Sequence, residues 1–393
     1  MTAVQIPLAQ CADEALHKLA RDTGSRALAA LDGTTLLGER AMLAGFSIPA
    51  RTSAGGGCRL YDALDDTVAL NLARPADREL LPALFQTDET ISNDAELAAQ
   101  MACSNAAELV QRGRSMGLAI AAEHEPSRPG DICVQLAKGC AAPRPPHRAP
   151  RVLDLSALWA GPLAAHLLWL AGAEVVKLEC RTRPDAMRTS SALFYALLNQ
   201  GKRSVAVDFA DANDRQALLT LIRASDIVIE AARPRALAQL GIDAAALVGS
   251  TPGQAWITIT AHGAQGEPAN WIGFGDDCGV GSGLSAALRE ATGSTGFVGD
   301  AIADPLTGIF AAFTAWNAWM SGEGGRFAVT MSSVAAQCLD QARTADAEAL
   351  HRTLVAWAAA AGQRFPAVAR RHIGTLPEFG EHTHSCLSPA APC

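Results

Sequence analysis

The stretch RVLDLSALWAGPLAAHLLWLAGAEVVKLE, from Arg151 to Glu179, decides the fold. Its first apolar run, Val152–Leu155, is short enough to be a buried strand. Ser156 offers an oxygen that caps the following helix, and residues 163–170 are apolar nearly all round, which predicts that this helix is buried. A second strand, predicted at Ala173–Leu178, completes a strand–helix–strand unit. This order is typical of a parallel βαβ crossover, whose first strand ends where open α/β sheets bind ligands.

Strands and helices continue to alternate after this unit, which predicts an α/β fold with a doubly wound parallel sheet. The predicted strands are residues 204–209, 227–230, 255–260 and 328–331, and the predicted helices are 214–224, 237–247, 306–319 and 346–361. Before the unit, the pattern predicts helices within 4–45, 76–85 and 94–115, and two short strands within 58–72 around an Asp65–Asp66 turn.

The segment PRPPHRAP, residues 143–150, has four prolines in eight residues, and so many prolines favour an extended linker. We expect it to separate a second, smaller α/β domain at 1–142 from a Rossmann-like domain at 151–335. A C-terminal helix and tail, 336–393, follow.

Composition excludes several classes of protein. Apolar residues make up 49% and charged residues 18%, as in ordinary globular proteins. A net charge of −8 without a lysine-rich block argues against nucleic acid as a partner. There is no signal-peptide pattern and no run of about 20 apolar residues, so a membrane partner is not expected. The ten cysteines form no CxxC pair, which favours reduced thiols in the cytoplasm and predicts no metal site.

Six motifs between Val152 and about Met331 resemble, in order, those of the class III coenzyme A transferases, a superfamily that also includes acyl-CoA racemases. The motifs are LDLSALWAGP, GAEVVKLE, NQGKRSVAVDF, ASDIVIE with RPRALAQLGID, ITITAHGAQGEP and VGDAIADPLTGIFAA. The resemblance implies that the Rossmann-like domain binds coenzyme A, with an acyl-CoA and a carboxylic acid as substrates and no tightly bound cofactor.

The resemblance also bears on assembly. Family members normally carry their small domain after the nucleotide-binding half, so its N-terminal place here predicts a rearranged domain order. They form threaded dimers, and we therefore expect a homodimer, made by packing or by exchange of the N-terminal domain.

Asp304, in the motif DPLTG, is the candidate catalytic residue that the resemblance implies. In the family, this carboxylate attacks the acyl-CoA carbonyl and an aspartyl–CoA thioester follows. The residues alone also allow an N-cap aspartate, with Pro305 in the first helical position. Both roles are compatible, because a helix N-terminus favours an ionised carboxylate. The family spacing to Thr307 and Gly308 selects Asp304, which leaves Asp300 as a loop residue.

The candidate coenzyme A contacts fall into two groups. The turn after the first strand supplies Trp159, Ala160, Gly161 and Pro162, and the strand ends supply Arg181, Arg183, Lys202 and Arg203. Guanidinium groups pair bidentately with phosphate oxygens, although each basic residue alone fits a solvated surface charge better. The chain departs from formyl-CoA transferase at Ala157, Trp159, Cys180, Ala231 and Ala232, so oxalate or formate specificity is not implied.

Two alternatives stay open, and a third, nicotinamide binding, has little support. An acyl-CoA racemase needs a histidine where this chain has Phe274, and His262 fits a structural or pocket-lining residue better than a base. The glycine-rich stretch 273–283 lacks the third glycine of a nicotinamide-binding fingerprint. A catalytically silent protein that binds coenzyme A is the remaining alternative.

Overall fold

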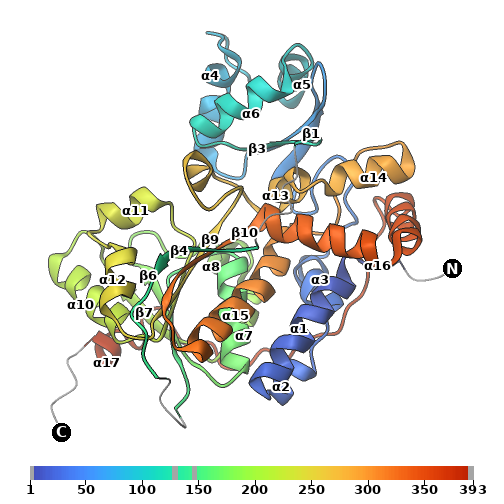
Figure 1. The fold of residues 1–393 in the computed structure, drawn as a ribbon. Helices are drawn as coiled ribbons and strands as arrows, with labels where there is room; N and C mark the ends of the chain where they lie inside the picture. Colours follow the sequence, from blue (N-terminus) through green and yellow to red (C-terminus); the bar gives the residue numbers. More distant parts are fainter. Residues whose placement is uncertain (1–3, 126–131, 144–147, 388–393) are drawn as a thin grey trace, which may run out of the picture.

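The dominant element of the fold is a seven-stranded, mostly parallel sheet (Figure 1). The computed structural model describes residues 4–125, 132–143 and 148–387. The strand order is β4-β10-β9-β8-β5-β6-β7, and all neighbours are parallel except β4 and β10. The strands are β4 Cys133–Lys138, β5 Arg151–Asp154, β6 Glu174–Cys180, β7 Arg203–Val207, β8 Ile227–Glu230, β9 Ala255–Thr260 and β10 Gly325–Thr330. The predicted α/β class and parallel sheet are confirmed.

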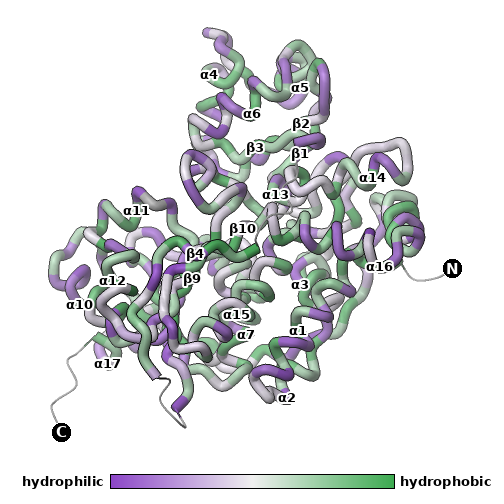
Figure 2. The backbone as a smooth tube through the Cα atoms, viewed as in Figure 1, coloured by the Kyte–Doolittle hydropathy of each residue, from purple (hydrophilic) through white to green (hydrophobic). Residues whose placement is uncertain are grey.

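Helices cover both faces of this sheet because successive strand residues point to opposite sides. Val152 packs into one buried cluster with α7 (Ala160–Leu170) and α15 (Ala303–Ser321). Leu153, the next residue, packs into another cluster on the other face. The helices around that second cluster are α10 (Ala212–Arg223), α11 (Pro234–Gln239) and α12 (Ala244–Ser250). In Figure 2 the stretch around β4 and β10 is coloured apolar, whereas hydrophilic stretches lie on the outer helices α10 and α16 (Met331–Ala359).

Two further parts surround this α/β unit. The helices α1 (Ala9–Thr23), α2 (Arg26–Ala29) and α3 (Gly33–Ala44) share the buried cluster of α7 and α15. A small antiparallel sheet has its own apolar cluster and lies at the top of Figure 1. It consists of β1 Cys58–Asp62, β2 Thr67–Asn71 and β3 Ala119–Ala122, with η1 Pro75–Leu80, α4 Leu81–Phe85, α5 Asp94–Ala102 and α6 Ala106–Ser115.

Six further helices complete the described part of the chain. They are α8 Met187–Ser190, α9 Ala192–Asn199, η2 Glu267–Asn270, α13 Gly275–Gly281, α14 Leu284–Thr292 and α17 Thr383–Leu387. Within the described ranges, no helix is both long and apolar enough to cross a membrane.

Packing joins the two sides of the predicted linker, of which residues 144–147 lie outside the described residues. The strand β4 precedes the linker yet pairs with β10 beyond it. The helices α1 and α3 pack against α15 and do not join the small sheet. The separate domain at 1–142 and the rearranged domain order stay predictions, and the compact small unit covers residues 58–122.

Three local predictions were wrong. Trp159, not Ser156, stands at the N-cap of α7, and the Ser156 hydroxyl bonds the Asp154 carboxylate instead. The helix α15 begins at Ala303, so Pro305 is its third residue and Asp304 its second. The single helix expected at 94–115 is two helices, because the Asn105 side chain caps α6 by accepting from two backbone N–H groups.

Candidate active site

Asp304 lies where the N-termini of three helices meet. It is in the first turn of α15, and its Oδ2 accepts a 3.0 Å hydrogen bond from the N–H of Gly275, the first residue of α13. The N–H of Ala160, the first residue of α7, also donates to this carboxylate. Helix N-termini carry partial positive charge, so this arrangement favours an anion at the Asp304 side chain.

Two glycines make this approach possible. A Cβ on Gly275 would lie 2.2 Å from the carbonyl oxygen of Ala301 and 2.4 Å from Oδ2 of Asp304. A Cβ on Gly308 would lie 2.8 Å from the carbonyl oxygen of Ala160. Gly308, in the DPLTG motif, therefore lets α15 pack closely against α7, and Gly275 lets α13 reach the carboxylate.

Charged side chains from separate segments surround this point. Arg40 of α3 binds both carboxylate oxygens of Asp300, and the Nε–Oδ2 bond is 2.9 Å long. Asp276 accepts a 3.1 Å hydrogen bond from the N–H of Ala301. Asp300 was predicted to be a loop residue; it lies in the turn before α15, but it is fully buried and ion-paired.

The surroundings change the pKa of these carboxylates. Burial raises the pKa of Asp304 to about 7, while Arg40 and the N–H groups of Gly275 and Ala160 act in the opposite direction. Burial likewise raises the pKa of Asp276 to about 6. Asp304 nevertheless keeps partial exposure. A poorly solvated carboxylate that is reachable and ionises near neutral pH suits nucleophilic catalysis.

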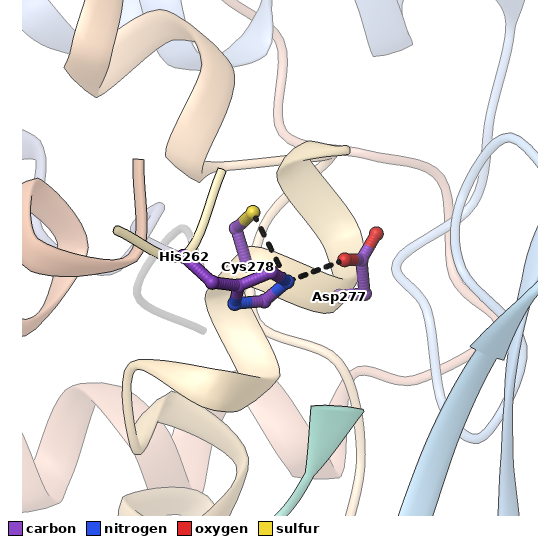
Figure 3. Close-up of side chains that lie close together, drawn as sticks. All are labelled: His262, Asp277 and Cys278. Atoms are coloured by element: carbon purple, nitrogen blue, oxygen red, sulfur yellow. Dashed lines mark hydrogen bonds and ion pairs between the residues drawn. The ribbon is translucent and has the colours of Figure 1, made fainter. Parts of the chain in front are cut away.

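A second polar group joins His262 to Asp277 and Cys278 of α13 (Figure 3). His262 Nδ1 is 3.3 Å from Nη2 of Arg114, which can only donate, so the ring proton is on Nε2. Nε2 in turn faces Oδ2 of Asp277 at 3.1 Å and Sγ of Cys278 at 3.8 Å. Burial lowers the pKa of His262 to about 3 and raises that of Asp277 to about 7. His262 is thus a neutral donor to Asp277.

Geometrically, His262, Asp277 and Cys278 are close enough to share a metal ion. Arg114 works against this, because it places the ring proton on Nε2, the atom that the metal would need. Asp277 also accepts a 2.8 Å bond from the N–H of Phe274, next to Gly275, so this group supports the start of α13. A second close group, Asp66, Glu123 and His124, is likewise held by internal bonds, such as His124 Nδ1 to Asp66 at 2.7 Å.

A cleft of about 850 Å³ lies between the small sheet and the large one. Its lining includes His262, Trp271 and Gly281, the last residue of α13, but not Asp304. The cleft therefore opens at the opposite end of α13 from the carboxylate. The role of Asp304 as the catalytic residue stays a prediction. His262 lines the cleft, as the sequence indicated.

The predicted turn residues Trp159, Ala160, Gly161 and Pro162 do surround the N-terminus of α7. A Cβ on Gly161 would lie 2.2 Å from Oγ of Ser156, so only glycine fits this turn. Trp159 is buried, and its ring contacts Phe194 edge-on with centroids 5.0 Å apart. Ala160 is the member of this set that touches the candidate nucleophile.

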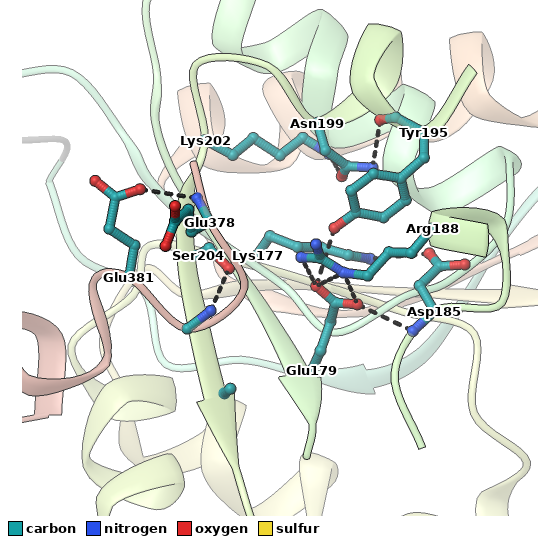
Figure 4. A network of polar contacts seen from close by, with 12 residues as sticks. Lys177, Glu179, Asp185, Arg188, Tyr195, Asn199, Lys202, Ser204, Glu378 and Glu381 are labelled. Atoms are coloured by element: carbon teal, nitrogen blue, oxygen red, sulfur yellow. Dashed lines mark hydrogen bonds and ion pairs between the residues drawn. The ribbon is translucent and has the colours of Figure 1, made fainter. Parts of the chain in front are cut away.

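Lys202 was predicted to bind a phosphate, but it points into the protein (Figure 4). Its Nζ donates to Asp154 at 2.9 Å, to the carbonyl of Pro162 at 2.9 Å and to Asn199 at 3.0 Å. All three N–H groups are used inside, so Lys202 is not available to coenzyme A. Figure 4 also shows Glu179 held by Arg188 and Tyr195, and the Arg188–Glu179 ion pair is partly buried.

The three arginines of the predicted set remain at the surface. Arg181 donates from Nε to the carbonyl of Ala206 at 3.1 Å, and Arg203 donates to the Ser385 hydroxyl at 3.0 Å. Arg183 is exposed. Their contact with coenzyme A stays a prediction. Sequence reasoning missed Arg40 and Asp276, because nothing in the local pattern around them points to Asp304.

Comparison with known proteins assigns this arrangement to one family. A family model described as CoA-transferase family III matches residues 150–365. The chain is 30% identical over 198 residues to the succinate–glutarate CoA-transferase of Agrobacterium fabrum, a match that covers 46% of this chain and 50% of that protein. It is 35% identical over 124 residues to a probable fatty acyl-CoA transferase of Mycobacterium tuberculosis, covering 30% and 32%.

The chain thus spans about half, or less, of the length of these relatives. A crystal structure of the hypothetical protein Rv3272 from Mycobacterium tuberculosis is similar with a TM-score of 0.46 at 28% identity. That match covers 52% of this chain and 61% of the other.

Proposed function

Because the chain belongs to CoA-transferase family III, we propose that it moves coenzyme A from an acyl-CoA to a carboxylic acid, with Asp304 as the nucleophile. The observation that carries the proposal is the Asp304 carboxylate itself, which is partly exposed and accepts N–H groups from the N-termini of α13 and α7. Family membership makes the acyl-CoA a substrate, and the acceptor and mechanism are the finer part of the proposal.

The proposed reaction exchanges an acyl group between oxygen and sulfur. An oxygen of Asp304 attacks the thioester carbonyl, the carbon–sulfur bond breaks, and the thiolate of coenzyme A leaves behind a mixed anhydride. The thiolate then attacks the aspartyl carbonyl, releasing the donor acid and forming an aspartyl–CoA thioester. An acceptor carboxylate repeats the two steps in reverse order, which yields the new acyl-CoA and free Asp304. Every bond broken is matched by one formed.

The N–H groups of Gly275 and Ala160 have a role after the first step as well. Once the aspartate is acylated, its carbonyl oxygen occupies the place of the former carboxylate oxygen. Attack on the aspartyl carbon then places negative charge on this oxygen, and the Gly275 N–H already points to Oδ2, while the Ala160 N–H acts on the same carboxylate. Fixed donors of this kind stabilise a tetrahedral oxyanion without reorganisation.

The experiment is a substrate panel with Asp304→Asn. Wild-type protein is incubated with acyl-CoA thioesters and carboxylic acids, and new thioesters are measured by mass spectrometry. We expect transfer and a covalent coenzyme A adduct on the wild type, and neither on Asp304→Asn, which keeps the shape of the side chain but removes its charge. The exposed Asp88→Asn is the matched control. Near-wild-type transfer by Asp304→Asn would refute the mechanism.

The same panel separates the alternatives. A racemase would exchange the α-proton of the acyl group for deuterium without any acceptor, and a silent binding protein would do neither. His262 forms hydrogen bonds with Asp277 and Arg114. No hydrogen bond joins it to Asp304 among the described residues, so the racemase is not favoured.

From the family resemblance we also expect a cytoplasmic homodimer, with the exposed Arg181, Arg183 and Arg203 near the phosphates of coenzyme A. Sedimentation and calorimetry with dephospho-CoA test these two points.

A further inference from the structure

We propose that Arg40 is the positioning residue of the site: it holds the turn that carries Asp304 and places a positive charge beside that carboxylate. This inference rests on the proposed function for its meaning in catalysis. Arg40 lies on α3, outside the residues 150–365 that match the family model, so the N-terminal part of the chain completes the site.

The first step is the strained turn ahead of α15. Ala301 has φ of 41°, in the left-handed region that residues other than glycine rarely adopt. Such a conformation persists only when its surroundings hold it. Arg40 binds both oxygens of the preceding Asp300, and Asp276 accepts the N–H of Ala301 itself. Asp304 follows three residues later, so the position of this turn sets where the carboxylate lies.

The second step is the contact between Arg40 and α7. The Arg40 guanidinium lies over the ring of Trp159, 4.8 Å from the ring centroid. It also lies 5.8 Å from the centroid of the Phe46 ring. Trp159 directly precedes Ala160, whose N–H donates to Asp304. Arg40 therefore contacts both segments that meet at the carboxylate, and a planar, bidentate group suits this better than a lysine does.

The third step is the balance of charge. Asp276 on α13 and Asp300 on the turn are the carboxylates near Asp304, and the thiol of Cys278 stays neutral because burial raises its pKa. Arg40 lowers the pKa of Asp304, and Asp276 raises it. Removing Arg40 leaves the negative charges without a counterion, so Asp304 would then ionise only at higher pH.

The test is a titration that does not depend on activity. Carboxyl-¹³C-labelled aspartate is introduced into the full chain, the Asp304 signal is assigned with Asp304→Asn, and its midpoint is measured by NMR. We expect Arg40→Met to raise the midpoint by about one pH unit or more, and Arg40→Lys, which keeps the charge, to restore most of it. Arg59→Met, an exposed arginine on β1, is the matched control and should leave the midpoint unchanged.

Because Arg40→Met leaves Asp300 buried and unpaired, the double variant Arg40→Met/Asp300→Asn is measured beside it. We expect it to fold and to keep the upward shift, since Arg40 and Asp276 are the charges that act most on Asp304. An Asp304 midpoint unchanged in both variants overturns the proposal, even if their melting temperature falls. A shifted midpoint in a protein that transfers no coenzyme A supports the role of Arg40 and counts against the proposed function alone.

Discussion

Replacing Gly275 by alanine tests the convergence of helices at Asp304 most directly. The added Cβ would lie 2.2 Å from the carbonyl oxygen of Ala301 and 2.4 Å from Oδ2 of Asp304. Neither neighbour is the far end of a flexible side chain, because one is backbone and the other is a short carboxylate in the first turn of α15. The start of α13 must therefore move away from α15 by about 1 Å to reach an ordinary contact distance.

This movement should cost both stability and rate. Overpacking of this kind destabilises a fold by about 1–3 kcal/mol. Lengthening the 3.0 Å bond from the Gly275 N–H to a carboxylate sacrifices up to about 1.5–3 kcal/mol of charge-assisted hydrogen bonding. A displacement of about 1 Å at a reacting group can cost about 10²-fold in rate. We expect Gly275→Ala to lower the free energy of unfolding in urea and to slow transfer of coenzyme A in initial-rate assays.

The matched control is Gly249→Ala in α12. A Cβ at this position meets nothing within 4 Å, so the change should leave the rate unchanged and stabilise the helix by about 0.5–1 kcal/mol. If Gly275→Ala has the same free energy of unfolding and the same transfer rate as the wild type, the close approach of α13 to Asp304 is not needed. The reasoning about three converging N-termini is then refuted.

Two further changes probe the buried charges. Lys202→Met should destabilise the protein by about 3–5 kcal/mol in urea denaturation. The change removes the Nζ that donates to Oδ2 of the fully buried Asp154 at 2.9 Å. An unchanged denaturation midpoint would show that Lys177 alone neutralises this carboxylate. Asp276 has a pKa raised from 3.8 to about 6, so its contribution to stability is complete below about pH 4 and is lost as the pH rises through about 6. Melting temperature should therefore fall less steeply over this range in Asp276→Asn, and equal slopes in the two proteins would contradict this. The acid limb of the transfer rate should also move to lower pH in that variant, because Asp276 raises the pKa of Asp304.

Local patterns sufficed for the six parallel strands of the sheet, which are mostly buried, but they missed the partly exposed edge strand β4. Runs such as Val152–Leu155 and Ile227–Glu230 are mostly apolar, and the parallel order follows from helices between them. The DPLTG motif likewise located the first turn of α15. These features depend on neighbours in the sequence, which is why they could be predicted.

The partners of Asp304 depend on tertiary contacts and could not be predicted in this way. Arg40 and Asp300, which bond each other, are 260 residues apart. Lys202 stands before a strand like a surface charge, yet packing turns it inward to Asp154. Ser156 has the right residue type for an N-cap, but α7 begins only at Ala160, with Trp159 at the N-cap. For Arg40 and Lys202 a segment distant in the sequence decided the role, whereas for Ser156 it was the neighbouring Asp154.

The capping and catalytic interpretations of Asp304 are compatible in a specific way. A capping aspartate satisfies the N–H groups of its own helix, but the bonds recorded for this carboxylate come from α13 and α7. Those donors belong to other helices and keep their positions when the aspartate changes from carboxylate to anhydride to thioester. The same two N–H groups can therefore hold the resting anion and the later oxyanion. Gly275 and Gly308, which allow this approach, are as much part of the proposed site as the nucleophile.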